Sequence, residues 1–418
     1  MWRVVSALAA ALWLAAGGAA QAQPVRIDKG RLDAALGQMV ASGRAAGVSA
    51  LIWQDGRERY FGAVGAADRE AQRPMRRDTL VQIWSMTKPV TGVALMQLWE
   101  QGRFRLDDPV SAYLPEFGQV RVDAGLDSSG RPLLKAPARP ITIRDLLRHT
   151  AGLSYGMRGE QPDAEYRRLD PLALSNDLPE MGRRLAEVPL HFDPGQEWSY
   201  SASVDVQALL VEKLAGVPFE TYVRTQILEP LRMRDTAWTQ PQAALPRLAA
   251  TYLVGPDGAL TRQPEAEMLA RNFAPHRLTM GGAGLVSSLD DYMRFARMLL
   301  NGGELDGARV LKASTIRLVA SDQLDPAVTK RHFLPSKGNV GFGFDFAVRV
   351  GPPLSATENR GAAGEFFWDG AASTLFWVDP ANRLTAVFFV QKMPFDGTLH
   401  RDFREAVYGA GYLGPPGD

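Results

Sequence analysis

The residues with the clearest potential for chemistry are Ser85 and Lys88, which stand three positions apart in the segment Ser85-Met86-Thr87-Lys88. Residues at this spacing share one face of a helix, so the Lys88 amine can lie beside the Ser85 hydroxyl. Burial disfavours the charged form of an amine and lowers its pKa, which lets it accept the serine proton. From spacing alone, a serine and a lysine on the solvated face of an amphipathic helix remain an alternative.

The sequence around Ser85 predicts where its hydroxyl lies. Val81, Ile83 and Trp84 precede it, and apolar residues then recur at helical spacing until Gly102 ends the run. We therefore expect Ser85 near a helix N-terminus, where backbone N–H groups point outward and favour developing negative charge.

Tyr200 is the candidate for a second group that transfers protons. A turn-forming run that begins with Asp193-Pro194-Gly195 leads into it, and a helical pattern over residues 204–214 follows. A tyrosine held at the end of a loop can present its hydroxyl to a cleft and relay a proton to a leaving group. A tyrosine at the rim of the site that only packs against the core is the alternative.

Residues 366–371, Phe-Phe-Trp-Asp-Gly-Ala, enter an expected strand over residues 374–378. Gly370 permits close approach of a ligand to the strand edge. The backbone N–H groups of Ser85 and Ala371 are then candidates for an oxyanion hole. An aromatic core strand without contact to a substrate is the alternative.

A second serine motif competes with Ser85. Gly152-Leu-Ser154-Tyr-Gly156 fits the Gly-x-Ser-x-Gly pattern, whose mechanism needs a strand before the serine and a helix after it. Residues 143–149 have a charged helical pattern instead of a buried strand. Ser154 is therefore not expected to be the nucleophile, and His149 is expected to be a structural hydrogen-bonding residue.

The elements that must position these residues fall into two groups. Helices are expected at residues 27–42, 143–149, 179–188, 204–214, 219–228 and 401–408, and strands at 48–53, 59–61, 374–378 and 384–390. Residues 120–140, rich in Gly, Pro and Ser, predict a long loop that shapes the mouth of the cleft. Strands at both ends predict an α/β lobe from residues 23–84 and 275–418, a mainly helical lobe from 85–274, and an active site between them.

Composition excludes several classes of function. Lys and Arg number 47 against 46 Asp and Glu in the 418 residues, so no net field attracts nucleic acid. The absence of cysteine excludes disulfides, thiol catalysis and thiolate metal sites. The five histidines are scattered and form no His-Glu-x-x-His pattern, so neither a metal nor a cofactor is expected.

Residues 1–22 have the pattern of a secretory signal. Arg3 gives a basic start, residues 4–16 are apolar, and Ala20-Gln21-Ala22 offers a small-residue cleavage site. A membrane anchor is the alternative, although the apolar run is shorter than the roughly 20 residues of a span. We expect cleavage near Ala22, a periplasmic or secreted location, and no membrane span in the mature chain.

Five motifs occur in one order along the chain: Ser85-Met-Thr-Lys88, His149-Thr-Ala-Gly-Leu153, Pro194-Gly-x-x-Trp-x-Tyr200-Ser201, Gly281-Gly-Ala-Gly-Leu-Val286 and Trp368-x-Gly370. Together they resemble the serine β-lactamase-related hydrolases, most closely the family VIII carboxylesterases, which are similar to class C β-lactamases. The resemblance extends from residue 27 to residue 408. It implies a fold like that of β-lactamases and penicillin-binding proteins, with an antiparallel sheet flanked by helices and an inserted helical lobe. It also implies that Ser85 is the acylated nucleophile, Lys88 its base and Tyr200 a proton relay.

Departures from the lactamase pattern bear on the substrate. Ala202 stands where the Tyr-x-Asn motif has its asparagine, and Trp368 replaces the lysine of the Lys-Thr-Gly motif. An indole in place of a cation removes an attraction for anions and adds apolar surface, which favours small neutral acyl esters. Asp369 departs from the Trp-Gly-Gly of similar esterases. Facing the cleft it would add negative charge, and facing solvent it would matter little.

Two other functions stay open. One is a D-stereospecific peptidase or β-lactamase of the same fold, and the other is a binding protein that has lost turnover.

Overall fold

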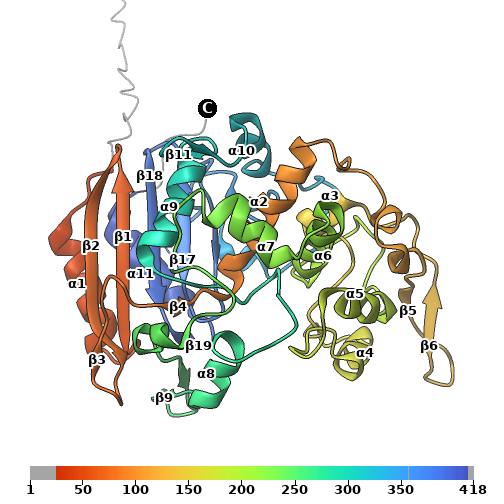
Figure 1. Cartoon of the computed structure of the whole chain (residues 1–418), viewed down its shortest axis with the longest axis horizontal. Coiled ribbons are helices and arrows are strands. Elements are labelled where there is room, and N and C mark those ends of the chain that lie inside the picture. Colours follow the sequence, from red (N-terminus) through yellow and green to blue (C-terminus); the bar gives the residue numbers. More distant parts are fainter. Residues whose placement is uncertain (1–24, 356, 413–418) are drawn as a thin grey trace, which may run out of the picture.

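An antiparallel sheet of eight strands is the main framework of the computed structural model, which describes residues 25–355 and 357–412. The expected signal segment, residues 1–22, lies outside the described residues. The strand order is β14-β15-β16-β17-β18-β1-β2-β3, so segments from both ends of the chain meet at the β18–β1 pair (Figure 1). The strands in that order are Val340–Phe342, Ala347–Arg349, Phe366–Asp369, Leu375–Asp379, Leu384–Val390, Gly47–Gln54, Arg57–Asp68 and Arg73–Pro74.

Helices cover both faces of this sheet. Helices α1 (Lys29–Ala41) and α11 (Gly397–Tyr408) pack together on one face, and α9 (Leu289–Leu300) lies across the other (Figure 1). Strand β18 is consequently buried at every position, which explains why its sequence is continuously apolar instead of alternating.

The middle of the chain is mainly helical. Helix α2 (Thr87–Glu100) follows a short 3-10 turn (Trp84–Met86) and packs along α6 (Ser203–Ala215). Because α2 is buried on nearly all sides, apolar residues occur around the whole helix, and Lys88 and Thr91 are buried polar exceptions. The other helices are α3 (Ile143–Leu147), α4 (Pro162–Leu169), α5 (Leu178–Glu187), α7 (Phe219–Val223), α8 (Glu265–Asn272) and α10 (Ala313–Val319).

Short strands connect these parts. They are β4 (Val81–Gln82), β5 (Val122–Leu126), β6 (Pro132–Lys135), β7 (Trp198–Ser199), β8 (Tyr252–Val254), β9 (Leu260–Arg262), β10 (Val286–Ser287), β11 (Glu304–Leu305), β12 (Ala308–Arg309), β13 (Arg331–His332) and β19 (Lys392–Met393). Strand β19 pairs with β8, so a C-terminal strand joins the small sheet of β8 and β9. The boundaries of the two expected lobes stay a prediction.

The predicted elements agree with the structure where apolar periodicity is strong. The strand expected at residues 384–390 is β18, and the helix expected at 27–42 is α1. The last helix begins four residues earlier than residue 401, at Gly397. The helix expected at 219–228 consists of α7 and a π-helical turn, Arg224–Leu228.

The prediction of a long loop at residues 120–140 is wrong, because the segment contains the hairpin of β5 and β6. Ser128, Ser129 and Gly130 lie in the turn, where Gly130 has a φ of 81° and the Asp127 carboxylate accepts the N–H groups of Ser129 and Arg131. All four residues of β6 are exposed, so no alternation marked the strand. The hairpin projects from the outer end of the helical region (Figure 1).

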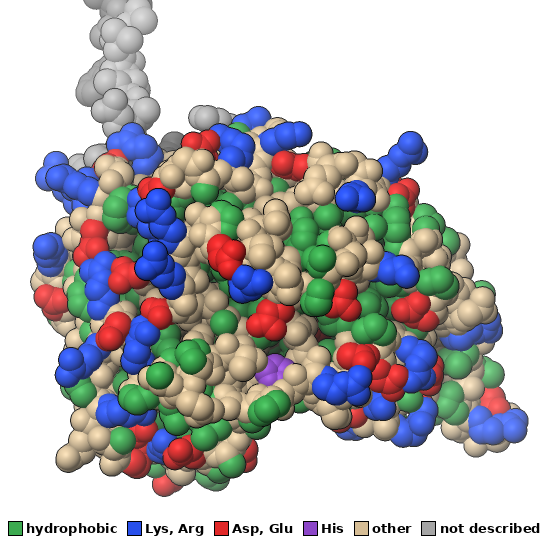
Figure 2. All heavy atoms as spheres, viewed as in Figure 1, with side chains coloured by type: hydrophobic (Ala, Val, Ile, Leu, Met, Phe, Trp, Pro, Cys, Tyr) green, Lys and Arg blue, Asp and Glu red, His purple; other side chains and the backbone are tan. Residues whose placement is uncertain are grey.

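The surface carries acidic and basic side chains interspersed over the face shown in Figure 2. This mixture accords with the formal net charge of +1. Within residues 25–355 and 357–412, no helix combines the length and apolarity needed to cross a membrane.

Candidate active site

Ser85 follows a sharp turn in the chain. Strand β4 pairs with β10, and the next residue, Ile83, donates its N–H to the Leu285 carbonyl at 3.0 Å and accepts the Thr374 hydroxyl at 3.3 Å. Trp84 then has a φ of 49°, a left-handed conformation that a bulky residue rarely adopts. Such strain persists only where the surroundings determine the backbone, and here it precedes the candidate nucleophile.

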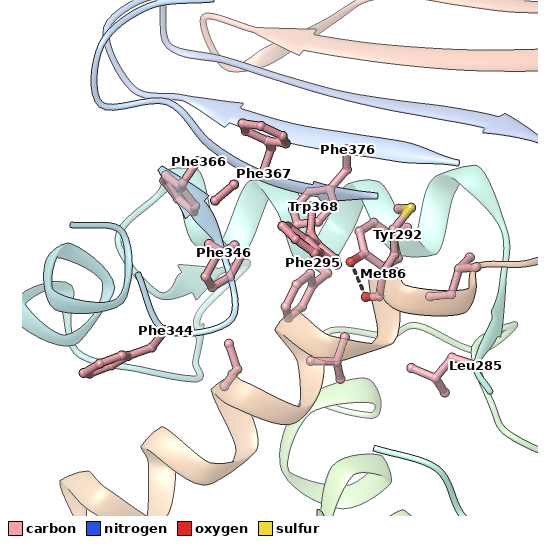
Figure 3. Packing of buried hydrophobic residues seen from close by; sticks show 14 of the residues in the cluster. Met86, Leu285, Tyr292, Phe295, Phe344, Phe346, Phe366, Phe367, Trp368 and Phe376 are labelled. Atoms are coloured by element: carbon pink, nitrogen blue, oxygen red, sulfur yellow. Dashed lines mark hydrogen bonds between the residues drawn. The ribbon is translucent and has the colours of Figure 1, made fainter. Parts of the chain in front are cut away.

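The residues after Ser85 are held equally firmly. The Tyr292 hydroxyl of α9 donates to the Met86 carbonyl at 2.7 Å, the hydrogen bond drawn in Figure 3. The Leu285 N–H donates to the Thr87 hydroxyl at 3.2 Å. The start of α2 is therefore fixed against both α9 and the segment that leads into β10.

Lys88 lies beside Ser85, as the spacing predicted. Its Nζ is 3.2 Å from Ser85 Oγ and donates to the Gly282 carbonyl at 2.7 Å. The side chain is only 1% exposed, and burial lowers the pKa of the amine to about 8, although the negative charges of Asp205, Asp345 and Asp369 oppose that shift. With this pKa about a tenth of Lys88 is uncharged at pH 7 and able to accept a proton.

Tyr200 completes the group around the Ser85 hydroxyl. The centre of its ring is 4.5 Å from Lys88 Nζ, and Trp368 Nε1 donates to its hydroxyl at 3.3 Å. Burial raises the pKa of this phenol, and hydrogen bonds with Ser85 and Trp368 offset only part of the shift. Tyr200 accordingly keeps its proton and can pass it on, whereas Lys88 is the better base.

Aromatic rings hold Tyr200 in place. Ring centres of its neighbours lie 5.1 to 6.0 Å away and belong to His149, Tyr155, Phe333 and Trp368. His149 is fully buried, and burial together with the charge of Lys88 holds its pKa well below the usual range. Its Nδ1 lies 3.1 Å from Ser201 Oγ, so the neutral imidazole acts as a buried support under the tyrosine.

Gly370 brings the end of β16 against the segment that leads into Ser85. A Cβ atom at this position would lie 2.5 Å from the Ile83 carbonyl oxygen and 2.2 Å from Thr374 Oγ1, so only glycine fits. The Gly370 N–H is engaged with the Thr374 carbonyl at 2.9 Å. Ala371, the next residue, is exposed and lines the same pocket as Ser85. The oxyanion role of the Ser85 and Ala371 N–H groups stays a prediction.

Asp369 faces inward and is paired. Its carboxylate forms an ion pair with Lys337, and both side chains are nearly buried. The Lys337 amine also lies near the rings of Phe333, Phe395 and Trp368, at 4.6, 4.1 and 5.5 Å from their centres. The charge of Asp369 is therefore balanced by Lys337, which ends the short 3-10 turn Leu334–Lys337.

These side chains surround a pocket of about 430 Å³. Its aromatic lining residues are Tyr155, Tyr200, Phe333, Trp368 and Phe395. Three further lining residues, Arg158, Glu160 and His332, are ionisable. Arg158 forms an ion pair with Glu160 at 2.8 Å, and His332 Nε2 lies 2.7 Å from Glu197, which is outside the pocket lining. The pocket thus offers a largely apolar space with compensated charge beside Ser85.

Figure 3 shows the packing behind the pocket. Phe295 and Tyr292 of α9 and Phe376 of β17 gather with Trp368 around the backbone of Met86. Ring centres of Tyr292 and Phe376 are 4.9 Å apart in an edge-to-face contact. This close packing supports Trp368 and the start of α2 from one aromatic cluster.

Ser154 lies in the same pocket wall and has partners that the sequence did not reveal. Its Oγ is 2.7 Å from His191 Nε2, and His191 Nδ1 is 2.7 Å from Glu160 Oε2. The hydroxyl also accepts the Gly156 N–H at 3.0 Å and is only 3% exposed. Helix α3, not a strand, precedes this loop.

The backbone around Ser154 requires glycine at positions 152 and 156. A Cβ atom at Gly152 would lie 2.4 Å from the Phe192 carbonyl oxygen, and one at Gly156 would lie 2.6 Å from the Tyr166 ring. Both glycines also have a positive φ. Close backbone approach and turn geometry therefore account for this Gly-x-Ser-x-Gly pattern.

Four residues near Lys88 were not predicted from the sequence as part of the site: Tyr155, Asp205, Gly282 and Asp345. Gly282 belongs to a motif quoted for the resemblance, but no role was assigned to it. The two buried aspartates carried no spacing signal, since one lies on α6 and the other on the loop between β14 and β15.

Comparison with known proteins gives consistent matches over most of the chain. A family model described as Beta-lactamase matches residues 32–409. Esterase EstB of Burkholderia gladioli is 34% identical over 404 residues, which covers 90% of this chain and 94% of EstB.

Two solved structures extend the likeness to three dimensions. EstCE1, described as a hydrolase with promiscuous acyltransferase activity, has a TM-score of 0.73 at 28% identity, covering 91% of this chain and 98% of its own. Unliganded simvastatin synthase (LovD) from Aspergillus terreus has a TM-score of 0.77 at 26% identity, with the same two coverages. These matches confirm the expected fold class.

Proposed function

This chain belongs to the β-lactamase family, and on that premise we propose that it is a serine carboxylesterase that cleaves small neutral esters. The observation that supports this most is the 3.2 Å contact between Ser85 Oγ and the buried Lys88 amine. Ser85 is half-buried and lines an apolar pocket, so a substrate carbonyl can reach it. The coarser activity, a hydrolase of the β-lactamase fold, agrees with the names of its relatives.

The proposed reaction is an acyl transfer in two halves. Ser85 Oγ attacks the ester carbonyl while the uncharged Lys88 amine takes its proton. The oxyanion is stabilised by the N–H groups of Ser85 and Ala371. The Tyr200 phenol passes a proton to the departing alcohol and is reprotonated from Lys88. Water then attacks the acyl-enzyme, and the same groups return Ser85 to its starting form.

The preference for neutral substrates rests on the charges around the pocket. Trp368 offers an apolar face where a lactamase-like lysine would bind an anion, and Lys337 is already paired with Asp369. Ala202 is fully buried and has no side-chain amide that could bind the side chain of a β-lactam. An anionic substrate would therefore lose hydration without gaining a free cation.

Transfer of the acyl group to an alcohol is a second candidate function. EstCE1 is described as having promiscuous acyltransferase activity, and LovD is named simvastatin synthase. In this chain the pocket is largely apolar, so an alcohol can compete with water for the acyl-enzyme. Product analysis with added 1-butanol separates the two, because transfer yields the butyl ester while hydrolysis yields the free acid.

Two assays test the proposed esterase. We expect turnover of chromogenic esters with short acyl chains and much slower turnover of a chromogenic cephalosporin. Faster turnover of the cephalosporin would instead support the lactamase alternative. A protein that is inert in both assays and forms no acyl-enzyme would support the binding protein.

Export through residues 1–22 is part of the proposal. N-terminal sequencing of the protein from a periplasmic fraction should begin near Gln23. An intact N-terminus in the cytoplasmic fraction would contradict it.

A further inference from the structure

The Gly282 peptide links a buried carboxylate to the candidate base. Its N–H donates to Asp205 Oδ1 at 2.9 Å, and its carbonyl oxygen accepts from Lys88 Nζ at 2.7 Å. Asp205 lies on α6 and is fully buried. One residue of the Gly281–Gly284 loop therefore connects α6 to the amine on α2.

Crowding around Gly282 makes this arrangement specific. A Cβ atom there would lie 2.7 Å from Tyr155 Oη, 2.8 Å from Asp205 Oδ2 and 3.3 Å from Lys88 Nζ. No side chain fits among these three polar atoms. The peptide is consequently held close to Lys88, and its orientation depends on the acceptor of its N–H.

We propose that Asp205 is a positioning residue for the Ser85–Lys88 pair, which it controls by holding the Gly282 N–H and thereby directing the Gly282 carbonyl at the Lys88 amine. The inference rests on the proposed function of this pair. Without that anchor the carbonyl can rotate away, and Lys88 loses the partner that keeps its Nζ beside Ser85 Oγ. A displacement of about 1 Å in a catalytic group can cost about 10²-fold in rate.

Asp205 also acts on the protonation of Lys88. Ionisable groups that face or influence the amine come from several elements: Ser85, Tyr155, Tyr200, His149, Asp205, Asp345 and Asp369. Burial is the largest influence on the pKa of Lys88 and lowers it, whereas the three aspartates raise it. Loss of the charge at Asp205 should therefore favour the free amine and lower this pKa further.

Three variants separate position from charge. Asp205→Ala removes both the acceptor and the charge, whereas Asp205→Asn keeps an oxygen that can accept the Gly282 N–H. Asp345→Asn replaces the other buried carboxyl near Lys88 without touching that hydrogen bond, since Asp345 Oδ1 accepts from Gln207 at 3.1 Å. Burial holds the pKa of Asp345 well above its usual value, so this variant changes less charge than Asp205→Asn. Asp291→Asn is the matched control, because this buried aspartate of α9 also accepts a backbone N–H, from Asp235 at 2.6 Å.

The readouts are kcat, KM and the pH dependence of kcat/KM for a short-chain ester, together with the thermal midpoint of each variant. We expect Asp205→Ala to lower kcat by about 10²-fold with little change in KM. Asp205→Asn should recover most of that loss, with its rising pH limb displaced by about one unit to lower pH. Asp345→Asn should move the limb less, because burial raises the pKa of Asp345 and favours its uncharged form, and it should cause no comparable loss of kcat. Asp291→Asn should change neither.

The inference is overturned if folded Asp205→Ala keeps the parent's kcat and pH limb, or if Asp205→Asn is as slow as Asp205→Ala. Should Asp205→Ala not fold, Asp205→Leu, which fills a similar volume without an acceptor, takes its place and must lower kcat at nearly constant KM. Ser85→Ala is measured with the same ester. If it retains hydrolysis the proposed function fails, whereas an inactive Ser85→Ala beside an unaffected Asp205→Ala refutes this inference alone.

Discussion

Two serines in one pocket wall have a base within hydrogen-bonding distance, and their surroundings differ. In the Ser85 cluster (Ser85, Lys88 and Tyr200), the serine is half-buried in the turn that leads into α2 and follows a strained residue. The Ser154 cluster (Ser154, His191 and Glu160) lies in a loop whose serine is 3% exposed and already accepts a backbone N–H.

The two clusters differ in how the serine hydroxyl is engaged. Ser154 Oγ is occupied by the Gly156 N–H and by His191, which is how a structural serine in a turn is satisfied. Ser85 instead lies beside the Lys88 amine, whose pKa is depressed, and shares its pocket with Ala371 at the end of a neighbouring strand. The depressed pKa of the Lys88 amine distinguishes the two clusters, and the proposed oxyanion role of Ala371 would add to that difference.

Removing each hydroxyl gives the largest contrast. Ser85→Ala should lower kcat by about 10⁴-fold or more, because the covalent route is lost. Ser154→Ala should leave kcat nearly unchanged but lower the free energy of unfolding by about 1–3 kcal/mol, since it strands buried polar groups. Ester hydrolysis and urea denaturation measure the two effects. The reverse pattern would make Ser154 the nucleophile.

Removing each base gives the next contrast. Lys88→Met keeps the length of the side chain without an amine and should cost about 10²–10⁴-fold in kcat. His191→Gln should instead act mainly on thermal stability, because His191 anchors the loop that carries Ser154 and Glu160. A His191 variant that folds normally but loses turnover would instead assign the role of base to His191.

The pH dependence of kcat/KM reports which base is in use. The free Lys88 amine is the reactive form and burial holds its pKa at about 8, so activity should rise with pH and reach half its plateau near pH 8. A stopped-flow pH profile measures this limb. A profile without an inflection near pH 8 would contradict this assignment.

The smallest expected effect concerns charge at the pocket wall. Asp369→Asn uncovers the Lys337 cation and should raise kcat/KM for a carboxylate-bearing ester about tenfold relative to a neutral one. The double variant Asp369→Asn/Lys337→Met is the matched control, since it removes both charges and should show no such gain. An unchanged ratio in the folded single variant would exclude the pair as a determinant of substrate charge.

The sequence predicted those parts of the molecule that depend on local pattern. Apolar runs marked β18 and α1, and the spacing of Ser85 and Lys88 placed one side chain beside the other. Contacts that join distant segments were not predictable in this way. Gly282 meets Lys88 across 194 positions, and periodicity shows only that a residue is buried, not against what.

Two further features of the site were not predicted, because they also depend on contacts between distant segments. The partner of Asp369 is Lys337, whose short turn gives no periodic signal, so the direction of the carboxylate could not be chosen. The triad-like geometry of Ser154, His191 and Glu160 depends on the path of two loops. The pattern of residues 143–149 correctly excluded a preceding strand there, because it forms α3.

The most direct test of the Ser85 assignment is covalent labelling with a fluorophosphonate, followed by peptide mass spectrometry on the parent, Ser85→Ala and Ser154→Ala. The account predicts a single adduct on Ser85 in the parent and in Ser154→Ala, and no adduct in Ser85→Ala. An adduct on Ser154, with labelling retained after loss of the Ser85 hydroxyl, would contradict it.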